Sequence, residues 1–226
     1  MMNSAIIVAG GSGTRMKSKT PKQFLLLAKK PFLLYSLEAF TQFDPDIQLV
    51  LVLPETFFLR WEEIVEQYNC SIPHTVMAGG ETRFQSVKNG LEALNQDGLV
   101  AIHDGARPLL SQTLISRTFD TATTFGNAIP VVPVSESMRI LEEAESRPID
   151  RAHYRLVQTP QVFRIPLIKK AYQQDFDSGF TDDATVIEAM GETVHLVDGD
   201  TINIKITHPS DLAQAEFLVN HIPNVD

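Results

Sequence analysis

Short apolar segments alternate with longer amphipathic segments along most of this chain. The apolar segments have the length of buried strands and cover 4–9, 47–53, 74–78, 99–102 and 128–134. The segments that follow them place apolar residues on one helical face and cover 31–42, 56–68, 83–94 and 111–124. Strands and helices that alternate at this spacing predict βαβ units. We therefore expect an α/β fold, a Rossmann-like open, mostly parallel sheet flanked by helices.

Residues 135–157 interrupt this alternation. Two strand-like pieces, 138–141 and 154–157, flank an acidic and polar connection at 142–148. This pattern predicts a projecting β-hairpin arm rather than a second domain. Residues 1–226 are accordingly expected to form a single domain with an arm at 135–157.

The alternation returns after the arm. Helices are predicted at 166–173 and 181–190, the second with Thr181 as its N-cap. Strand pieces follow at 194–197 and 202–206, and a final amphipathic helix opens at Pro209 and Asp211.

The charge of the chain is acidic overall but basic at its start. Lys and Arg number 19 against 28 Asp and Glu, a net charge of −9, so general nucleic-acid binding is not expected. Residues 1–37 contain no Asp or Glu, and their cationic residues are Arg15, Lys17, Lys19, Lys22, Lys29 and Lys30. A small, highly charged anionic ligand suits this segment; the alternative is a solvated basic loop.

The cysteine content and the hydropathy of the chain indicate in which cellular compartment the protein is expected. Cys70 is the one cysteine, which excludes an internal disulfide framework and a Cys-based zinc cluster. The apolar run at 5–9 is too short for a signal peptide or a membrane span. We expect a soluble, cytoplasmic protein without a membrane partner.

Two motifs follow predicted strands, where ligands bind in open parallel sheets. The first is the glycine loop GGSGTR at 10–15, and the second is HDGARP at 103–108. Glycines let backbone N–H groups approach a phosphate, and the guanidinium of Arg15 matches phosphate geometry. The alternative for the loop is a plain tight turn after a strand. With Arg15 and Lys22 attached to it, phosphate binding is the preferred hypothesis.

Several segments in order resemble one enzyme family. The opening IIVAGGSGTRM with PKQF is similar to nucleotidyltransferases that act on sugar or polyol phosphates. Together with HDGARP, PVSESMR (133–139), QTPQVF (158–163), GFTDDA (179–184) and NIKIT (203–207), it resembles the 2-C-methyl-D-erythritol 4-phosphate cytidylyltransferases of the non-mevalonate isoprenoid route. The resemblance implies the nucleotide-diphospho-sugar transferase fold. It also implies transfer of CMP from CTP to the acceptor phosphate, with release of pyrophosphate.

The resemblance also implies roles for particular residues. The catalytic cations would be Arg15 and Lys22 at the triphosphate, and Arg151 and Lys205 at the acceptor phosphate. The nucleotide would be bound by Ala9, Gly10, Gly11, Gly13, Gly80, Glu81 and Ser86. The acceptor would be contacted by Asp104, Arg107, Ser137 and Thr159. Because the arm carries Ser137 and Arg151, the family pattern implies a homodimer in which the arm completes the partner's site.

Asp104 has three open readings. It would be a ligand of Mg²⁺, which the family uses, since such sites often combine one carboxylate with substrate phosphates. It would alternatively accept hydrogen bonds from the polyol hydroxyls, or pair with Arg107 to brace the loop. Neighbouring His103 is expected to be packed or hydrogen-bonded rather than catalytic.

Two departures from the family pattern are Ser137, where threonine is expected, and Gly105, where alanine is common. Neither changes the expected chemistry. One rival hypothesis is a ribitol 5-phosphate cytidylyltransferase, which shares the glycine loop, PKQF and TPQ. Another is a non-catalytic nucleotide-binding protein, which would not need to keep both groups of cations.

Overall fold

The computed structural model describes residues 2–11, 21–142 and 145–221, with Lys22 described by its backbone alone. Its central sheet has the strand order β10-β7-β11-β6-β1-β4-β5, and β12 pairs with β7. The strands are β1 (Met2–Val8), β4 (Gln48–Leu53), β5 (Thr75–Ala78), β6 (Gly98–Asp104), β7 (Asn127–Pro133), β10 (Arg155–Val157), β11 (Gln161–Arg164) and β12 (Leu196–Asp198). Strands β5, β4, β1 and β6 are parallel, and so are β7 and β12, whereas β10 and β11 run antiparallel to their neighbours. The expected mostly parallel sheet is confirmed.

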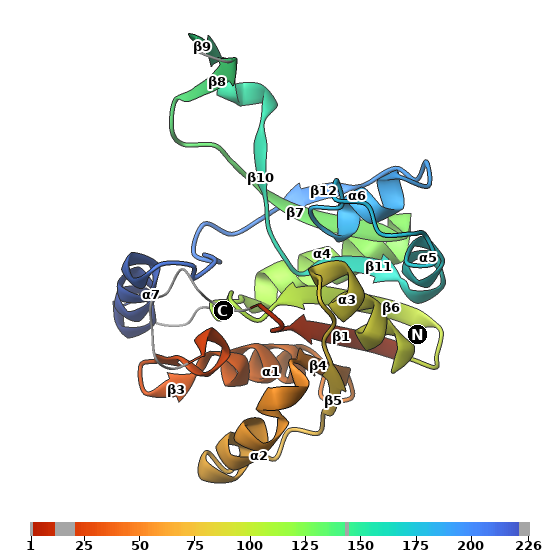
Figure 1. The fold of residues 1–226 in the computed structure, drawn as a ribbon, viewed down its shortest axis with the longest axis vertical. Helices are drawn as coiled ribbons and strands as arrows, with labels where there is room; N and C mark the ends of the chain where they lie inside the picture. The colour runs from red at the N-terminus through yellow and green to blue at the C-terminus, as the bar shows by residue number, and fades with distance from the viewer. Residues whose placement is uncertain (1, 12–20, 143–144, 222–226) are drawn as a thin grey trace.

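Helices cover both faces of this sheet (Figure 1). They are α1 (Phe32–Phe43), α2 (Phe58–Gln67), α3 (Arg83–Glu92), α4 (Gln112–Phe125), α5 (Ile165–Ala171), α6 (Asp183–Glu188) and α7 (Pro209–His221). Alternate residues of β1 point to opposite faces. Ala5 and Ile7 pack with α1, α2 and α4, whereas Ile6 packs with α3, α5 and α6. Because both faces are buried, the strands read as continuous apolar runs rather than alternating ones.

Helix ends follow the local sequence. The side chain of Ser111 accepts a hydrogen bond from the amide of Leu114 and so caps α4, which ends at Gly126 in the left-handed region with φ 92°. Thr82 caps α3 in the same way through the amide of Gln85. Helix α6 differs from the prediction, because its N-cap is Asp182 and not Thr181. Asp182 and Thr185 form a reciprocal capping box there.

The arm is built differently from its prediction. Strand β8 (Met138–Glu142) pairs with β9 (Glu145–Ile149), so the segment expected to be a connection is itself a strand, while β10 leaves the arm and pairs with β7. The hairpin projects from the rest of the molecule (Figure 1). Its pairing includes polar cross-strand contacts, such as Arg147 to Glu142 at 2.9 Å. A strand that is exposed on both faces carries no apolar period, which is why hydropathy did not reveal β9.

A small separate cluster of apolar residues packs together with a short β-hairpin and the last helix. Strands β2 (Leu26–Leu27) and β3 (Lys30–Pro31) form a short hairpin, which the sequence did not predict. Leu27 packs with Ile206 and with Ala215 of α7 in a separate apolar cluster. The strand predicted at 202–206 is absent, because its apolar residues are buried by this cluster and not by the sheet.

Candidate active site

The two predicted ligand-facing motifs lie at the same edge of the sheet. Strands β1 and β6 are adjacent and parallel, with Val8 opposite Asp104, and the amide of Gly105 donates to the carbonyl of Val8 at 2.9 Å. The glycine loop therefore begins directly beside the HDGARP segment. Parallel strands bring residues about a hundred positions apart to one place, as the fold class requires.

The first turn of the glycine loop is held by Gln23, which sequence reasoning passed over. Gln23 is buried in the short helix η2 (Lys22–Phe24), and its side-chain amide donates to the carbonyls of Ala9 and Gly11 at 2.8 and 2.7 Å. This bond ties the PKQF segment to the loop that precedes it. The motif itself was visible in the sequence, but nothing in its spacing indicated which side chain fastens the loop.

The predicted base-reading residues meet at the start of α3. The hydroxyl of Ser86 accepts a hydrogen bond from the amide of Gly80 at 3.1 Å and donates to the carbonyl of Thr82 at 2.9 Å. A Cβ at Gly10 would lie 3.2 Å from the Ser86 oxygen, so the loop and the helix approach closely because position 10 lacks a side chain. Glu81 is exposed beside them. The start of the glycine loop, Gly80 and the Ser86 hydroxyl therefore lie close together.

Two predicted site residues, Gly13 and Arg15, lie outside the described residues. Lys22 begins η2, and its side chain is not described. Their predicted roles at the triphosphate therefore remain predictions. What the structure adds is the position of the Lys22 backbone, one residue from the side chain that fastens the glycine loop.

Asp104 lies at the centre of a group of cations. The Nζ of Lys205 is 2.7 Å from its Oδ2, the Nε of Arg83 is 3.4 Å from its Oδ1, and the Nε of Arg107 is 3.9 Å from its Oδ2. Burial alone would raise the pKa of Asp104, but these three cations outweigh burial and hold it well below its usual range. Asp104 is thus an ionised anchor for cations drawn from three separate segments of the chain.

Arg107 is itself fixed by carbonyl groups. Its guanidinium donates to the carbonyl of Asn203 at 2.7 Å, which joins the HDGARP loop to the segment that carries Lys205. The amide of Ile206 donates to the carbonyl of Ala106 at 2.9 Å, so the two segments are joined on both sides of Lys205. The Lys205 side chain remains 44% exposed, and its ammonium can reach a ligand as well as Asp104.

His103, Thr159 and the backbone of Asp104 form a buried chain of hydrogen bonds. The backbone amide of Asp104 donates to the Thr159 hydroxyl at 3.0 Å, and that hydroxyl lies 3.2 Å from Nδ1 of His103. The Nε2 of His103 lies 3.0 Å from the carbonyl of Arg107, which can only accept, so Nε2 carries the proton and Nδ1 accepts from Thr159. His103 is packed and hydrogen-bonded, as expected. Thr159 here contacts the loop from below.

The arm residues lie apart from this group in the contacts of the described chain. Arg151 begins the short helix η4 (Arg151–His153), where its guanidinium donates to the carbonyl of Ser135 at the foot of the arm. Ser137 is exposed just before β8. No contact described within one chain joins Ser137 or Arg151 to Asp104. Among the described residues, a single chain therefore brings Lys205 to Asp104 but does not bring Arg151 there.

The predicted Mg²⁺ ligand does not fit a cation in this arrangement. No group of three or more His, Cys, Asp or Glu suitable for a metal occurs in the described part of the chain. Both oxygens of Asp104 already face cations, which would repel a divalent ion. A metal would reach Asp104 only after Lys205 had moved to another anion.

The buried histidine predicts a specific loss of stability in acid. The pKa of His103 is lowered to about 4; burial is the largest cause, Asp104 and the hydrogen bond to the Arg107 carbonyl oppose it, and the charges of Arg107 and Lys205 add to it. Between about pH 6.5 and 4 the unfolded chain gains a proton that the folded chain does not, so stability is complete above pH 6.5 and falls as the pH falls, by about 3 kcal/mol in all. Urea unfolding at several pH values measures this loss.

A His103→Gln variant removes the titrating group while keeping a donor for the carbonyl of Arg107, and we expect most of the loss between pH 6.5 and 4 to disappear. Exposed His153, changed to Gln, is the matched control and should keep the parent's loss. Asp104 contributes only below about pH 4, where an unfolded Asp takes up its proton, so the two effects separate. An equally steep loss in His103→Gln would contradict the assignment.

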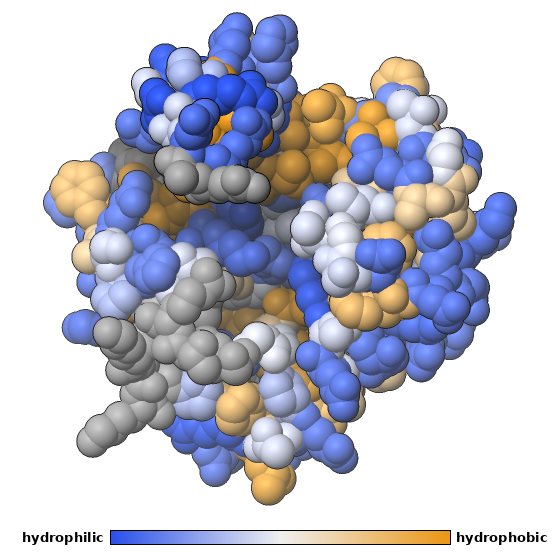
Figure 2. Space-filling model, turned by 45° about the horizontal axis from the view of Figure 1, so that its top comes forward, coloured by the Kyte–Doolittle hydropathy of each residue, from blue (hydrophilic) through white to orange (hydrophobic). Residues whose placement is uncertain are grey.

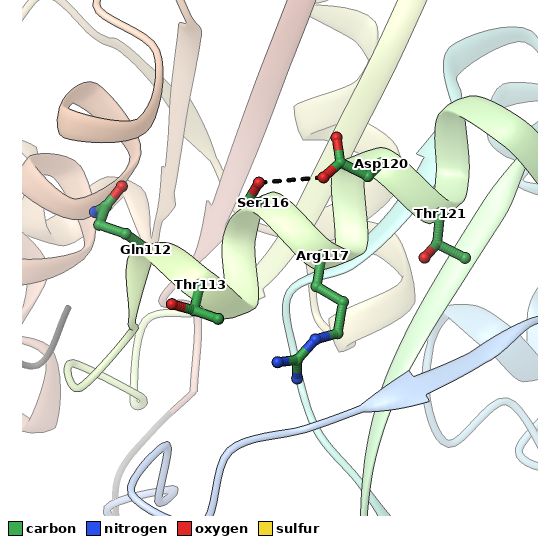
Figure 3. Close-up of a pocket in the computed structure, with 6 residues that line it drawn as sticks. All are labelled: Gln112, Thr113, Ser116, Arg117, Asp120 and Thr121. Atoms are coloured by element: carbon green, nitrogen blue, oxygen red, sulfur yellow. Dashed lines mark hydrogen bonds between the residues drawn. The ribbon is translucent and has the colours of Figure 1, made fainter.

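A concave surface also runs along α4, away from the predicted site residues (Figure 3). Its lining residues are Gln112, Thr113, Ser116, Arg117, Asp120 and Thr121. None of them was predicted as a site residue, and α4 covers the opposite face of the sheet from α3. Arg117 there donates to the carbonyl of Asp198, so it fastens β12 rather than offering an open cation.

These features define a nucleotidyltransferase: a doubly covered parallel sheet, with a glycine loop and a cluster of cations at the carboxyl ends of adjacent strands. A family model described as 2-C-methyl-D-erythritol 4-phosphate cytidylyltransferase matches residues 3–221. The chain belongs to this family.

Individual relatives agree with this membership. The enzyme of the same name from Bacteroides fragilis is 51% identical over 219 residues, covering 97% of this chain and 100% of the relative. A crystal structure of the Thermus thermophilus enzyme has a TM-score of 0.78 at 33% identity, covering 97% of this chain and all of that chain. The Anaerococcus prevotii structure, named a 4-diphosphocytidyl-2C-methyl-D-erythritol synthase, has a TM-score of 0.83 at 27% identity, covering 97% and 96%. No helix in the described ranges is long and apolar enough to cross a membrane.

Proposed function

We propose that this protein transfers CMP from CTP to 2-C-methyl-D-erythritol 4-phosphate, forming 4-diphosphocytidyl-2-C-methyl-D-erythritol and pyrophosphate for isoprenoid precursor synthesis. The observation that carries the proposal is family membership over residues 3–221. The cation cluster around Asp104, beside the glycine loop, supports it. A binding protein without turnover would not need a second group of cations next to the nucleotide loop.

The reaction needs charge and position more than acid–base chemistry. An oxygen of the acceptor phosphate forms a bond to the α-phosphorus of CTP, and the bond from that phosphorus to the β-phosphate oxygen breaks, so pyrophosphate leaves. Arg15 and Lys22 would stabilise the charge that develops on the α-phosphate, and Lys205 with Arg151 would hold the acceptor phosphate. At pH 7 a phosphate monoester is already largely a dianion, since its second pKa is about 6, and it needs no general base.

The nucleotide would be read beside Ser86. The carbonyls of Ala9 and Gly80 and the backbone of Gly10 would line one edge of the base, and the Ser86 hydroxyl, which donates to the carbonyl of Thr82, could accept one further hydrogen bond. Gly11, Gly13 and Glu81 complete the predicted nucleotide set. Asp104, Arg107, Ser137 and Thr159 are proposed for the acceptor, with Asp104 holding Lys205 in place until the phosphate arrives.

The proposal includes Mg²⁺, a homodimer and a cytoplasmic location. The metal would enter with CTP and be held chiefly by triphosphate oxygens, where it offsets phosphate charge. Exposed apolar side chains on the two strands that flank β7, Leu156 and Val157 of β10 and Leu196 of β12, support pairing with a second copy through the arm side. The space-filling view shows hydrophobic surface beside the projecting arm and a hydrophilic hollow below it (Figure 2).

Pyrophosphate release tests the function directly. The protein is incubated with CTP, Mg²⁺ and either 2-C-methyl-D-erythritol 4-phosphate or ribitol 5-phosphate, and release is expected with the first acceptor. Release with ribitol 5-phosphate alone would move the assignment to the rival acceptor. No release with either acceptor would favour a binding protein. Replacement of CTP by ATP or UTP is the control for base recognition.

A further inference from the structure

Two buried side chains, Asp183 and Tyr172, and the partly exposed Arg83 lie next to the site and have no role in the scheme above. Arg83 opens α3 and Asp183 opens α6, two helices that pack on the same face of the sheet. The two terminal nitrogens of Arg83 donate to the two carboxylate oxygens of Asp183 at 2.8 and 2.7 Å. The hydroxyl of Tyr172 donates to Oδ1 of the same carboxylate at 2.6 Å. This arrangement is a bidentate ion pair with a third hydrogen bond on it.

The surroundings hold these three side chains in one geometry. Asp183 is 0% exposed, and the ring of Tyr172 stacks on Phe84 with centroids 4.6 Å apart. Burial and the charge of Asp183 raise the pKa of the Tyr172 phenol, so it stays a donor. The attraction of the two carboxylates outweighs burial and keeps the Arg83 guanidinium charged. A bidentate pair fixes the plane of a guanidinium as well as its position.

A further donor of that guanidinium, the Nε–H group, points at the active site. With both terminal nitrogens on Asp183, the Nε of Arg83 faces Oδ1 of Asp104 at 3.4 Å, while Oδ2 of Asp104 faces Lys205 at 2.7 Å. A carboxylate can turn about its side-chain bond, so a fixed cation at one oxygen sets the direction of the other. Arg83 thus links a buried, fixed pair to the carboxylate that holds Lys205.

We propose that Arg83 is a positioning residue for the transfer reaction. Held by Asp183 and Tyr172, it orients Asp104 so that Lys205 is presented to the acceptor phosphate. This inference rests on the proposed function of the site. Arginine is required because one side chain must satisfy two carboxylates in a fixed geometry, whereas a lysine ammonium is a single point charge on a flexible stem.

The first test is Arg83→Lys, which keeps a cation beside buried Asp183 and so avoids an unpaired buried charge. We expect kcat to fall about 10-fold, since loss of an outer supporting partner typically costs 10–100-fold. The KM for CTP should stay near the parent value, because Arg83 acts on the acceptor side. Arg60→Lys is the matched control; Arg60 pairs with Glu63 on the surface of α2, and that variant should be unchanged.

A double-mutant cycle separates positioning from simple support of the fold. If Arg83 acts through Asp104, Arg83→Lys should have little further effect on kcat in an Asp104→Asn background. Tyr172→Phe removes a single hydrogen bond to Asp183. It provides a second test of the same inference if Arg83→Lys does not fold. It should lower kcat modestly in the parent and not in the Asp104→Asn background.

Three results would overturn the inference: effects of Arg83→Lys that multiply fully with those of Asp104→Asn, a change confined to the KM for CTP, or no effect of Arg83→Lys in an active parent. Activity of the parent protein in the same assay keeps these outcomes apart from failure of the proposed function. A parent that releases no pyrophosphate refutes the function, whereas an active parent with an unaffected Arg83→Lys variant refutes the positioning role alone.

Discussion

Lys22→Ala should lower kcat on the order of 10²-fold or more, as the loss of one transition-state donor typically does. Lys22 lies in PKQF, immediately before the side chain that fastens the glycine loop through two carbonyls. Its charge is expected to act on the α-phosphate only as the five-coordinate phosphorus forms, so kcat should fall more than the KM for CTP rises. Steady-state pyrophosphate release at saturating acceptor measures both constants.

Lys29→Ala is the matched control for this prediction. Lys29 lies in the same basic segment and is exposed, so it shares the local charge but not the PKQF position. It should keep activity within about 2-fold of the parent, as surface substitutions away from a site usually do. Equal losses in both variants would mean that Lys22 contributes general positive potential and no specific contact, and would refute its catalytic assignment.

Arg151→Ala should also lose about 10²-fold in kcat/KM for the polyol phosphate, and a mixture with Lys22→Ala should recover part of the activity. Arg151 lies at the foot of the arm, away from Asp104 in the contacts described within one chain. If the arm acts on the partner's site, a mixed dimer contains one site with both lesions and one with neither. Random exchange of subunits then restores about a quarter of the parent activity.

The control for exchange is a mixture of Lys22→Ala with Lys205→Ala, both of which lie in the body of the chain. Each site of that mixed dimer keeps one lesion, so no recovery is expected. Recovery absent from both mixtures, with exchange verified by a mass-tagged subunit, would place Arg151 in its own chain's site and remove the catalytic reason for a dimer.

The parallel core was predictable because each of its strands and helices shows its own hydropathy pattern within a short stretch of sequence. Buried strands such as 47–53 are apolar on both faces, and in helices such as 83–94 the apolar residues repeat at the helical period. Each element can therefore be recognised from its own sequence. The arm was predictable as a projecting hairpin with its first strand at 138–141, but its second strand was not, since β9 is exposed and its polar residues pair across the hairpin. Strand β11 was missed because it is short and begins with Gln161, a buried polar residue whose side chain bonds the start of α6.

Some residues of the site were likewise predictable from the sequence, and others were not. Motifs located Asp104 and Lys205, and the fold explains their meeting through the ends of β6 and the 203–207 segment. The partnership of Arg83 with Asp183 spans 100 residues and joins two helix starts. From the sequence, Asp183 could be placed only near the start of a predicted helix, because no sequence spacing encodes a contact between helices that merely pack side by side.

The cluster around Asp104 has a consequence for how the protein responds to simple salts. Arg83, Arg107 and Lys205 outnumber the carboxylates of Asp104 and Asp183 by one, so the group keeps a surplus positive charge. Any compact oxyanion that settles there lowers the repulsion among these side chains and favours the folded chain by mass action. Sulfate or inorganic phosphate in a buffer would consequently stabilise the folded protein and would also compete with the acceptor phosphate for this cluster.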